Sequence, residues 1–171
     1  SVTLKKLALA TDLDDLNNSL KDKILEKTLH FKEANKIAKL GIWEHDIVNK
    51  SVTWSDEIYD LFKINKNEFN LTYDSLLELI HPDDRNFVHN AYLKSLEEKI
   101  PYEIKHRLLL PNEEIRWVLE KCTTKFNIKN EPIFSIGIMQ DITKNEELKE
   151  KELLLQEQSR MISMGQMIGN I

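Results

Sequence analysis

The residues that could do chemistry are few and scattered along the chain. Its five His and single Cys show no zinc-ligand spacing, and the HExxH pattern of zinc proteases is absent. The four Gly residues lie too far apart to form a phosphate-binding loop. No nucleophile motif supports a Ser/His/Asp triad, and the carboxylates fall in helix first turns or on charged helix faces. The sequence therefore predicts no catalytic residue and no metal site, so we expect this fragment not to be an enzyme.

The composition of the chain limits the compartment and the kinds of partner that it suits. Cys122 is the single cysteine, so it cannot form an internal disulfide, and it fits a reducing cytoplasm. The net charge of −5 argues against a nucleic-acid-binding surface. There is no run of 18 apolar residues and no secretory leader in the sequence. The first residue is Ser, which is typical of a piece of a longer protein. We expect a cytoplasmic fragment whose parent could carry a membrane anchor upstream.

Residues 1–40 predict a long amphipathic helix. The segment contains no Gly or Pro, and its apolar residues recur at steps of four and three with charged residues between them. We expect Gly41 to end this helix. Two interpretations of the apolar seam stay open: packing on the chain's own domain, or a parallel coiled coil with a second copy through Leu13, Leu16 and Leu20.

Residues 41–143 differ in composition from the first forty and contain all three Trp, all four Pro and all four Tyr. Two segments of alternating hydrophobicity come first, then a block of short helices, then three longer alternating segments joined by tight turns. This order predicts an α+β domain: a five-stranded antiparallel sheet with short helices on one face, flanked by long N- and C-terminal helices.

A set of short motifs in this domain occurs in a characteristic order and spacing. The motifs are Trp43 with Asp46, Trp54-Ser55, His81-Pro82-Asp83-Asp84-Arg85, Arg116-Trp117 and Asp141-Ile142-Thr143. Together they resemble a PAS domain of the HPDDR/RW/DIT type, over about 105 residues. The chain departs from that pattern at two late hairpins, where the family often has Asp-Gly and this sequence has PNEE and IKNEP. The resemblance implies the PAS fold and a sensory role.

The resemblance also implies a ligand pocket between the sheet and the helices. Strand alternation then predicts which side chains face it. We expect Tyr59, Arg107 and Gln140 as polar contacts and Trp117, Ile136 and Ile138 as apolar ones, which suits a small, mainly apolar ligand with one polar anchor.

The same resemblance suggests which cofactors to consider, and it does not identify one. Haem-binding relatives use a His on the long helix as the iron ligand, and His89 falls at a similar position, so a haem-based gas sensor is one alternative. A flavin adduct is disfavoured because Cys122 is placed mid-strand and the Asn-Cys-Arg motif is absent. The pocket could equally hold nothing.

Residues 144–171 predict a C-terminal signalling helix. Thr143 and Glu146 fit a capping box that would begin it. Two sevenfold stripes, one containing Leu155 and Ile162 and the other offset by one residue, indicate a coiled-coil seam of ambiguous register. Asp141, Ile142 and Thr143 would then relay a signal from the sheet into this helix.

The last eleven residues, MISMGQMIGNI from Met161 to Ile171, resemble the opening of the dimerisation helix of sensor histidine kinases. That resemblance implies a bacterial two-component system, with the phosphoacceptor His, the ATP-binding domain, the phosphorelay and a response regulator beyond this segment. We expect a sensory and dimerisation module, a parallel homodimer, that relays a signal to the kinase core by helix repacking. A ligand-free interaction module is the alternative of a different class.

Overall fold

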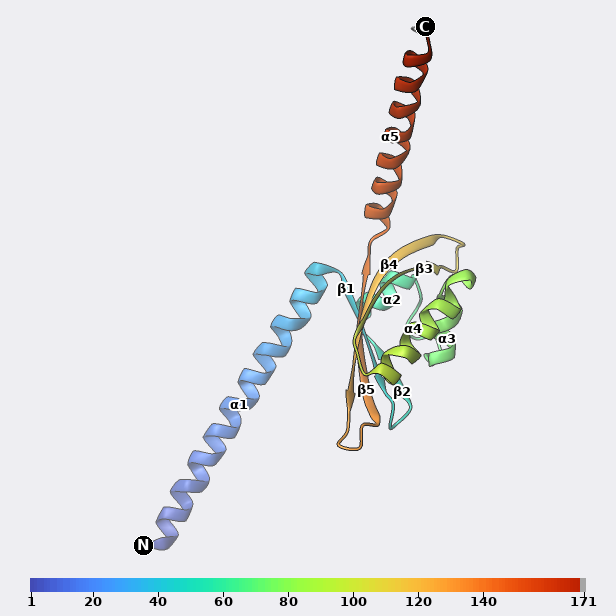
Figure 1. Cartoon of the computed structure of the whole chain (residues 1–171). Helices are drawn as coiled ribbons and strands as arrows, with labels where there is room; N and C mark the ends of the chain where they lie inside the picture. Colours follow the sequence, from blue (N-terminus) through green and yellow to red (C-terminus); the bar gives the residue numbers. More distant parts are fainter. Residues whose placement is uncertain (170–171) are drawn as a thin grey trace. The chain divides into compact units, whose positions relative to one another are not determined.

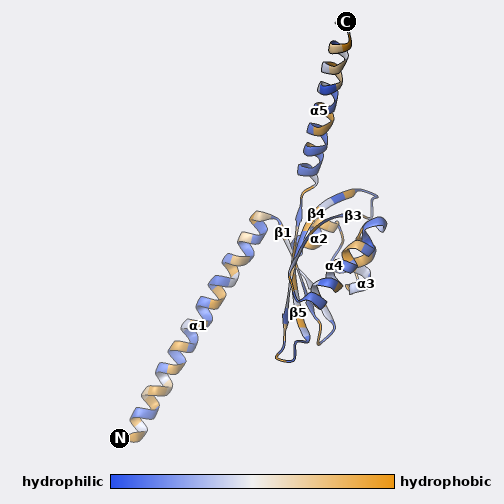
Figure 2. Cartoon of the chain, in the orientation of Figure 1, coloured by the Kyte–Doolittle hydropathy of each residue, from blue (hydrophilic) through white to orange (hydrophobic). Residues whose placement is uncertain are grey.

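The computed structural model describes residues 1–169 and divides the chain into two compact units, Ser1–Lys39 and Leu40–Ile171. The first unit is one helix, α1 (Val2–Ala38), none of whose residues is buried. Apolar residues recur along its length (Figure 2), and the seam side chains Leu13, Leu16 and Leu20 are 50–63% exposed. The dimerisation role predicted for this seam therefore stays a prediction.

Lys39, rather than Gly41, ends α1. Lys39 adopts the left-handed conformation at φ 51°, and its N–H donates to carbonyls of the last turn. Gly41 lies two residues later, inside the first strand and buried. A Cβ there would overlap the Ile58 side chain, so the glycine is required for close packing and the prediction that it stops the helix is wrong.

The second unit has the predicted α+β fold. Its strands are β1 (Leu40–Asp46), β2 (Ser51–Trp54), β3 (Tyr102–Leu109), β4 (Ile115–Phe126) and β5 (Pro132–Asp141). They form one antiparallel sheet in the order β2-β1-β5-β4-β3. The first strand, β1, thus pairs with the last strand, β5, at the centre of the sheet. This pairing brings the start of the domain beside the strand that leads into the C-terminal helix (Figure 1).

Short helices cover one face of the sheet. They are α2 (Asp56–Phe62), α3 (Tyr73–Leu79), the 3-10 turn η1 (Pro82–Asp84) and α4 (Arg85–Glu98), and Figure 1 shows them on the same side. The Thr72 hydroxyl accepts from the Ser75 N–H to begin α3. Trp54 stacks on Phe62 at a ring distance of 5.2 Å, which anchors α2 to the sheet.

The two hairpins without Asp-Gly turn by a different route. Glu113 and Asn130 each adopt φ 63°, the left-handed conformation that Gly usually supplies. The Asn112 and Asn127 side chains accept backbone N–H groups across the turns. Glu113 and Asn130 thus take the backbone conformation of the glycine that the family often has at these turns, and both hairpins still form.

The C-terminal helix, α5 (Thr143–Gly169), follows β5 after a single residue, Ile142. None of its described residues is buried, and the two sevenfold stripes are 51–74% exposed from Leu148 to Ile168. The end of the predicted segment, residues 170–171, lies outside the described residues. No helix within residues 1–169 is long and apolar enough to cross a membrane.

Candidate functional site

A small cavity lies between the inner face of the sheet and the helices. Its volume is about 20 Å³, which is room for about one water molecule. Strands β1, β2, β3, β4 and β5 and helices α3 and α4 all contribute to its wall. The lining residues are Trp43, His45, Val52, Tyr73, Leu76, Leu77, Ile80, Val88, Tyr92, Tyr102, Glu120 and Met139.

Aromatic rings form much of this wall. Trp43 and Tyr92 meet edge to face with ring centroids 6.3 Å apart, and Tyr73 lies 5.7 Å from Tyr92. His45 stacks on Tyr73 at 6.0 Å. Gly137 makes this arrangement possible, because a Cβ there would overlap the Trp43 indole. The cavity is thus surrounded by rings from β1, α3 and α4.

One carboxylate, Glu120 on β4, lies in the wall and is 2% exposed. Its Oε1 accepts from Trp43 Nε1–H at 3.1 Å and from the Tyr102 hydroxyl at 2.9 Å. Its Oε2 lies 2.8 Å from Nε2 of His106, a residue with no exposed surface. A buried carboxylate is stabilised by such hydrogen bonds, so these partners explain how the charge is tolerated.

The tyrosine hydroxyls at the cavity remain protonated hydrogen-bonding groups. Burial raises the pKa values of Tyr73, Tyr92 and Tyr102, and the nearby Glu120 adds to the effect at Tyr73 and Tyr102. The Tyr92 hydroxyl lies 3.0 Å from His45 Nδ1 and 3.1 Å from the Ser135 hydroxyl. The cavity wall is therefore polar only at a few fixed points.

None of the six residues predicted to contact a ligand lines this cavity. On β4 and β5 the buried side chains include Val118, Glu120 and Met139, so Trp117, Ile136 and Ile138 point to the other face and the predicted facing of these strands is wrong. The reason is that both faces carry apolar residues, so alternation alone does not distinguish them.

The three predicted polar contacts have other positions. Tyr59 is buried against Trp54, with ring centroids 5.3 Å apart. Arg107 makes a two-pronged ion pair with Asp84, with Nη2 and Nε donating to the two carboxylate oxygens at 2.6 and 3.0 Å. Gln140 is exposed at the end of β5. Arg107 thus ties β3 to the HPDDR segment at η1.

Neither Glu120 nor His106 was predicted from the sequence as a residue of the site. A signal for Glu120 existed, because Glu120 is in phase with Val118 and Cys122, two residues that prefer the interior. Cys122 is indeed buried in the structure, and this burial raises the pKa of its thiol to about 12. An acidic residue in register with such neighbours predicts a buried polar group.

The cavity and His89 do not fit a haem. His89 is on α4 but is absent from the cavity wall, and its Nδ1 lies 3.1 Å from the Tyr73 hydroxyl. A space for about one water is far smaller than a porphyrin. The structure therefore lends no support to the gas-sensor alternative.

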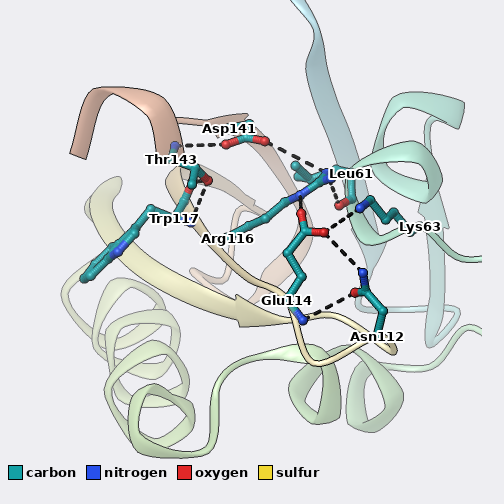
Figure 3. A network of polar contacts seen from close by, with 8 residues as sticks. All are labelled: Leu61, Lys63, Asn112, Glu114, Arg116, Trp117, Asp141 and Thr143. Atoms are coloured by element: carbon teal, nitrogen blue, oxygen red, sulfur yellow. Dashed lines mark hydrogen bonds and ion pairs between the residues drawn. The ribbon is translucent and has the colours of Figure 1, made fainter. Parts of the chain in front are cut away.

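A second polar site lies where the sheet meets α5 (Figure 3). Arg116 on β4 is its hub: Nη1 donates to the Leu61 carbonyl at 2.8 Å, and Nε donates to Glu114 Oε1 at 2.9 Å. The same guanidinium lies 3.9 Å from Asp141. Arg116 therefore joins the end of α2, the β3–β4 hairpin and the last residue of β5.

Lys63 also reaches this network, with its ammonium 2.5 Å from Glu114 Oε2. Hydrogen bonds from Lys63, Arg116 and Asn112 lower the pKa of Glu114 to about 2. Glu114 is therefore ionised at neutral pH and holds both cations against the hairpin. Because 38% of the Glu114 side chain is exposed to solvent, the pairing fixes geometry more than it adds stability.

The start of α5 is held by β4. The Trp117 N–H donates to the Thr143 hydroxyl at 3.0 Å, and the Ile142 N–H donates to the Trp117 carbonyl at 2.9 Å. Asp141 Oδ1 accepts from the Thr143 N–H at 2.9 Å, and Lys105 Nζ lies 2.8 Å from Glu146 Oε1. Asp141 is thus the acceptor at the helix start.

The capping box predicted for Thr143 and Glu146 is wrong in its partners. The Glu146 N–H donates to the Ile142 carbonyl, and the Thr143 hydroxyl is taken by the neighbouring strand. Sequence spacing could not reveal this competition, because Trp117 is 26 residues away. The predicted relay residues Asp141, Ile142 and Thr143 do lie together at the junction.

Known proteins resemble this domain in both sequence and fold. A family model described as PAS fold matches residues 51–139. The chain is 25% identical over 131 residues to the probable diguanylate cyclase DgcE of Escherichia coli, which covers 75% of this chain and 11% of that protein. The chain spans about a tenth of the length of the curated relatives that it matches, between 8% and 11%.

Two solved structures have a similar fold. One is a sensory box histidine kinase/response regulator from Burkholderia thailandensis, with a TM-score of 0.65, 22% identity, and coverage of 77% of this chain and 98% of that chain. The other is the N-terminal domain of a diguanylate cyclase with PAS/PAC sensor from Marinobacter aquaeolei, with a TM-score of 0.57, 18% identity, and coverage of 63% and 98%. At these identities the likeness concerns the fold.

Proposed function

Because the chain belongs to the PAS fold family, we propose that it is the sensory and dimerisation module of a cytoplasmic two-component sensor histidine kinase. The fragment itself catalyses nothing in this proposal. A change at the cavity or at α1 alters how α5 packs, and the altered packing controls a kinase core that passes phosphate to a response regulator.

The observation that carries the proposal is the junction between the sheet and α5. Arg116 contacts α2, the β3–β4 hairpin and Asp141, while the Trp117 backbone holds both Ile142 and Thr143. A shift of α2 or of strand β4 would therefore change the position at which α5 begins. This geometry supports a mechanical relay that requires no bond-making step.

The junction is tested by two substitutions in the full-length parent. Asp141→Asn and Arg116→Met each remove one partner of the 3.9 Å ion pair. We expect both to change basal autophosphorylation in the same direction. Lys121→Met is the matched control and should change little, because Lys121 is an exposed cation on the same strand as Arg116 and pairs with Glu103 of β3 at 2.7 Å. Unchanged activity in all three variants would contradict the relay.

Dimerisation is the second part of the proposal. The seam of α1 exposes three leucines by half or more, and such surfaces favour a partner helix. Sedimentation at micromolar concentration should give twice the monomer mass, and Leu13→Lys, Leu16→Lys and Leu20→Lys combined should lower it. Asp15→Lys, Asn18→Lys and Asp22→Lys combined, on the polar side of the helix, are the control. A monomeric wild type would overturn this part.

A diguanylate cyclase output is the second candidate, because the relative from Escherichia coli is a probable cyclase. The kinase is favoured by the likeness of residues 161–171 to the opening of a kinase dimerisation helix. The full-length parent decides between the two. Autophosphorylation from ATP supports the kinase, whereas synthesis of cyclic diguanylate from GTP supports the cyclase.

A further inference from the structure

We propose that the cavity binds a small methylated ammonium ion, of which methylammonium is the best fit. The proposal rests on the sensory role proposed above and names the ligand class for the cavity. The observation behind it is a carboxylate enclosed by aromatic rings. Trp43, Tyr73, Tyr92 and Tyr102 line the same space as Glu120.

The charge balance of the cavity favours a cation. No Lys or Arg is among the residues that line it. Trp43 and Tyr102 are neutral donors to Glu120, so they stabilise its charge without cancelling it. The two carboxylate oxygens have about four acceptor positions. Three are occupied by Trp43, Tyr102 and His106, which leaves one on Oε2 for an ammonium N–H.

His106 does not remove the need for a cation. Its Nε2 lies against Glu120, and its Nδ1 is buried without a hydrogen-bond partner among the described residues. A neutral imidazole with the proton on Nε2 leaves only a lone pair unmatched. An imidazolium would bury an unpaired N–H, which is more costly. With its proton on Nε2, the ring is a third neutral donor to Glu120 and stabilises the carboxylate without cancelling its charge.

The aromatic wall selects the type of cation. Aromatic faces attract organic ammonium groups, and cages of such rings are the usual way proteins recognise methylated ammonium. Hard metal ions require several oxygen ligands, whereas the single carboxylate here is already bonded to three donors. The apolar side chains Leu76, Leu77 and Ile80 would contact the methyl groups.

Size favours the smallest ligand of this class. The cavity has room for about one water molecule, which matches an ammonium head without methyl groups. Each added methyl requires an outward movement of α3, the seven-residue helix that supplies Tyr73, Leu76 and Leu77. Leu76 is the only buried residue of α3. That movement would carry ligand binding to the surface of the domain.

The test uses the whole 171-residue chain and the indole N–H signal of Trp43 in NMR spectra. Titration with methylammonium chloride should shift this signal in a saturable manner. Methanol, a neutral molecule of similar size, should not shift it at the same concentration, and sodium chloride controls for ionic strength. The indole of Trp117, which points away from the cavity, is the internal control.

Two substitutions separate the charge from the rings. Tyr73→Phe keeps the aromatic face and should leave the dissociation constant within about twofold, whereas Tyr73→Leu should raise it about tenfold. Glu120→Gln should raise it about tenfold or more. Equal shifts by methanol, or no shift in the wild type, would overturn the proposal. Either outcome leaves the relay untouched, because the junction test uses no ligand.

Discussion

The hydroxyl of Thr143 should be what fixes the start of α5 to the sheet, and Thr143→Val tests it. Valine has nearly the same shape, so the change removes the oxygen without opening a hole. The Trp117 N–H then loses its 3.0 Å acceptor, while the bond from the Ile142 N–H to the Trp117 carbonyl remains.

The magnitude follows from the burial of the site. An unsatisfied buried N–H costs about 1–3 kcal/mol, and Thr143 and Trp117 are only half-buried, so water replaces part of the lost bond. We expect a loss of about 1 kcal/mol in the free energy of unfolding. Locally, the Trp117 and Glu146 amides should exchange with solvent faster, because both depend on the position of the first turn of α5.

Hydrogen exchange read by NMR measures this effect directly, with urea unfolding for the global stability. Thr123→Val is the matched control, because Thr123 is an exposed residue of the same strand. It should change neither amide. If Thr143→Val left the Trp117 and Glu146 amides as protected as in the wild type, the strand would not be holding the helix through this hydroxyl.

Two further predictions concern the packing and the charges of the domain. Gly137→Ala should lower the free energy of unfolding by about 1–3 kcal/mol and disturb the near-ultraviolet circular dichroism of Trp43, because the added methyl group overlaps the indole. Gly165→Ala is the control and should not destabilise the chain, because there is open space around Gly165. Hydrogen bonds from Arg107 lower the pKa of Asp84, so its contribution is present above about pH 4 and is lost as the pH falls through the lower, folded value. The urea midpoint of Asp84→Asn should therefore be reduced at pH 7 and approach that of the wild type in acid; equal midpoints at pH 7 would contradict this.

The fold could be predicted from the sequence because its signals are local. Turn residues, strand alternation and short helix starts occur in the order that the sheet requires, and the family motifs agree with them. The end of α1 was less predictable, because Lys39 adopts a backbone conformation that sequence rules assign to Gly. Gly41 instead serves a packing contact, because a Cβ at this position would overlap the Ile58 side chain.

The candidate site was harder to predict because it depends on contacts between distant residues. The outer face of β5 carries Ile136 and Ile138, so hydrophobicity could not tell which face is inside. The buried bond between Trp43 and Glu120 joins residues 77 positions apart. Local rules describe neither, whereas the family motif at Asp141 and Thr143 did locate the junction.

The central claim is that α5 transmits a change of helix packing. Leu148, Leu155 and Ile162 form one sevenfold stripe, and a second stripe is offset from it by one residue; both are exposed in this chain and available to a partner helix. Two seam registers of similar energy would give a switchable helix.

The most direct measurement is autophosphorylation of the full-length parent after insertions between Lys149 and Glu150. One inserted residue rotates the following helix by about 100° relative to the sheet, whereas seven residues restore nearly the same face. We predict that the single insertion locks the activity high or low and that the seven-residue insertion keeps it regulated. If regulation survived both insertions unchanged, α5 would be a tether and the helix-repacking account would be wrong.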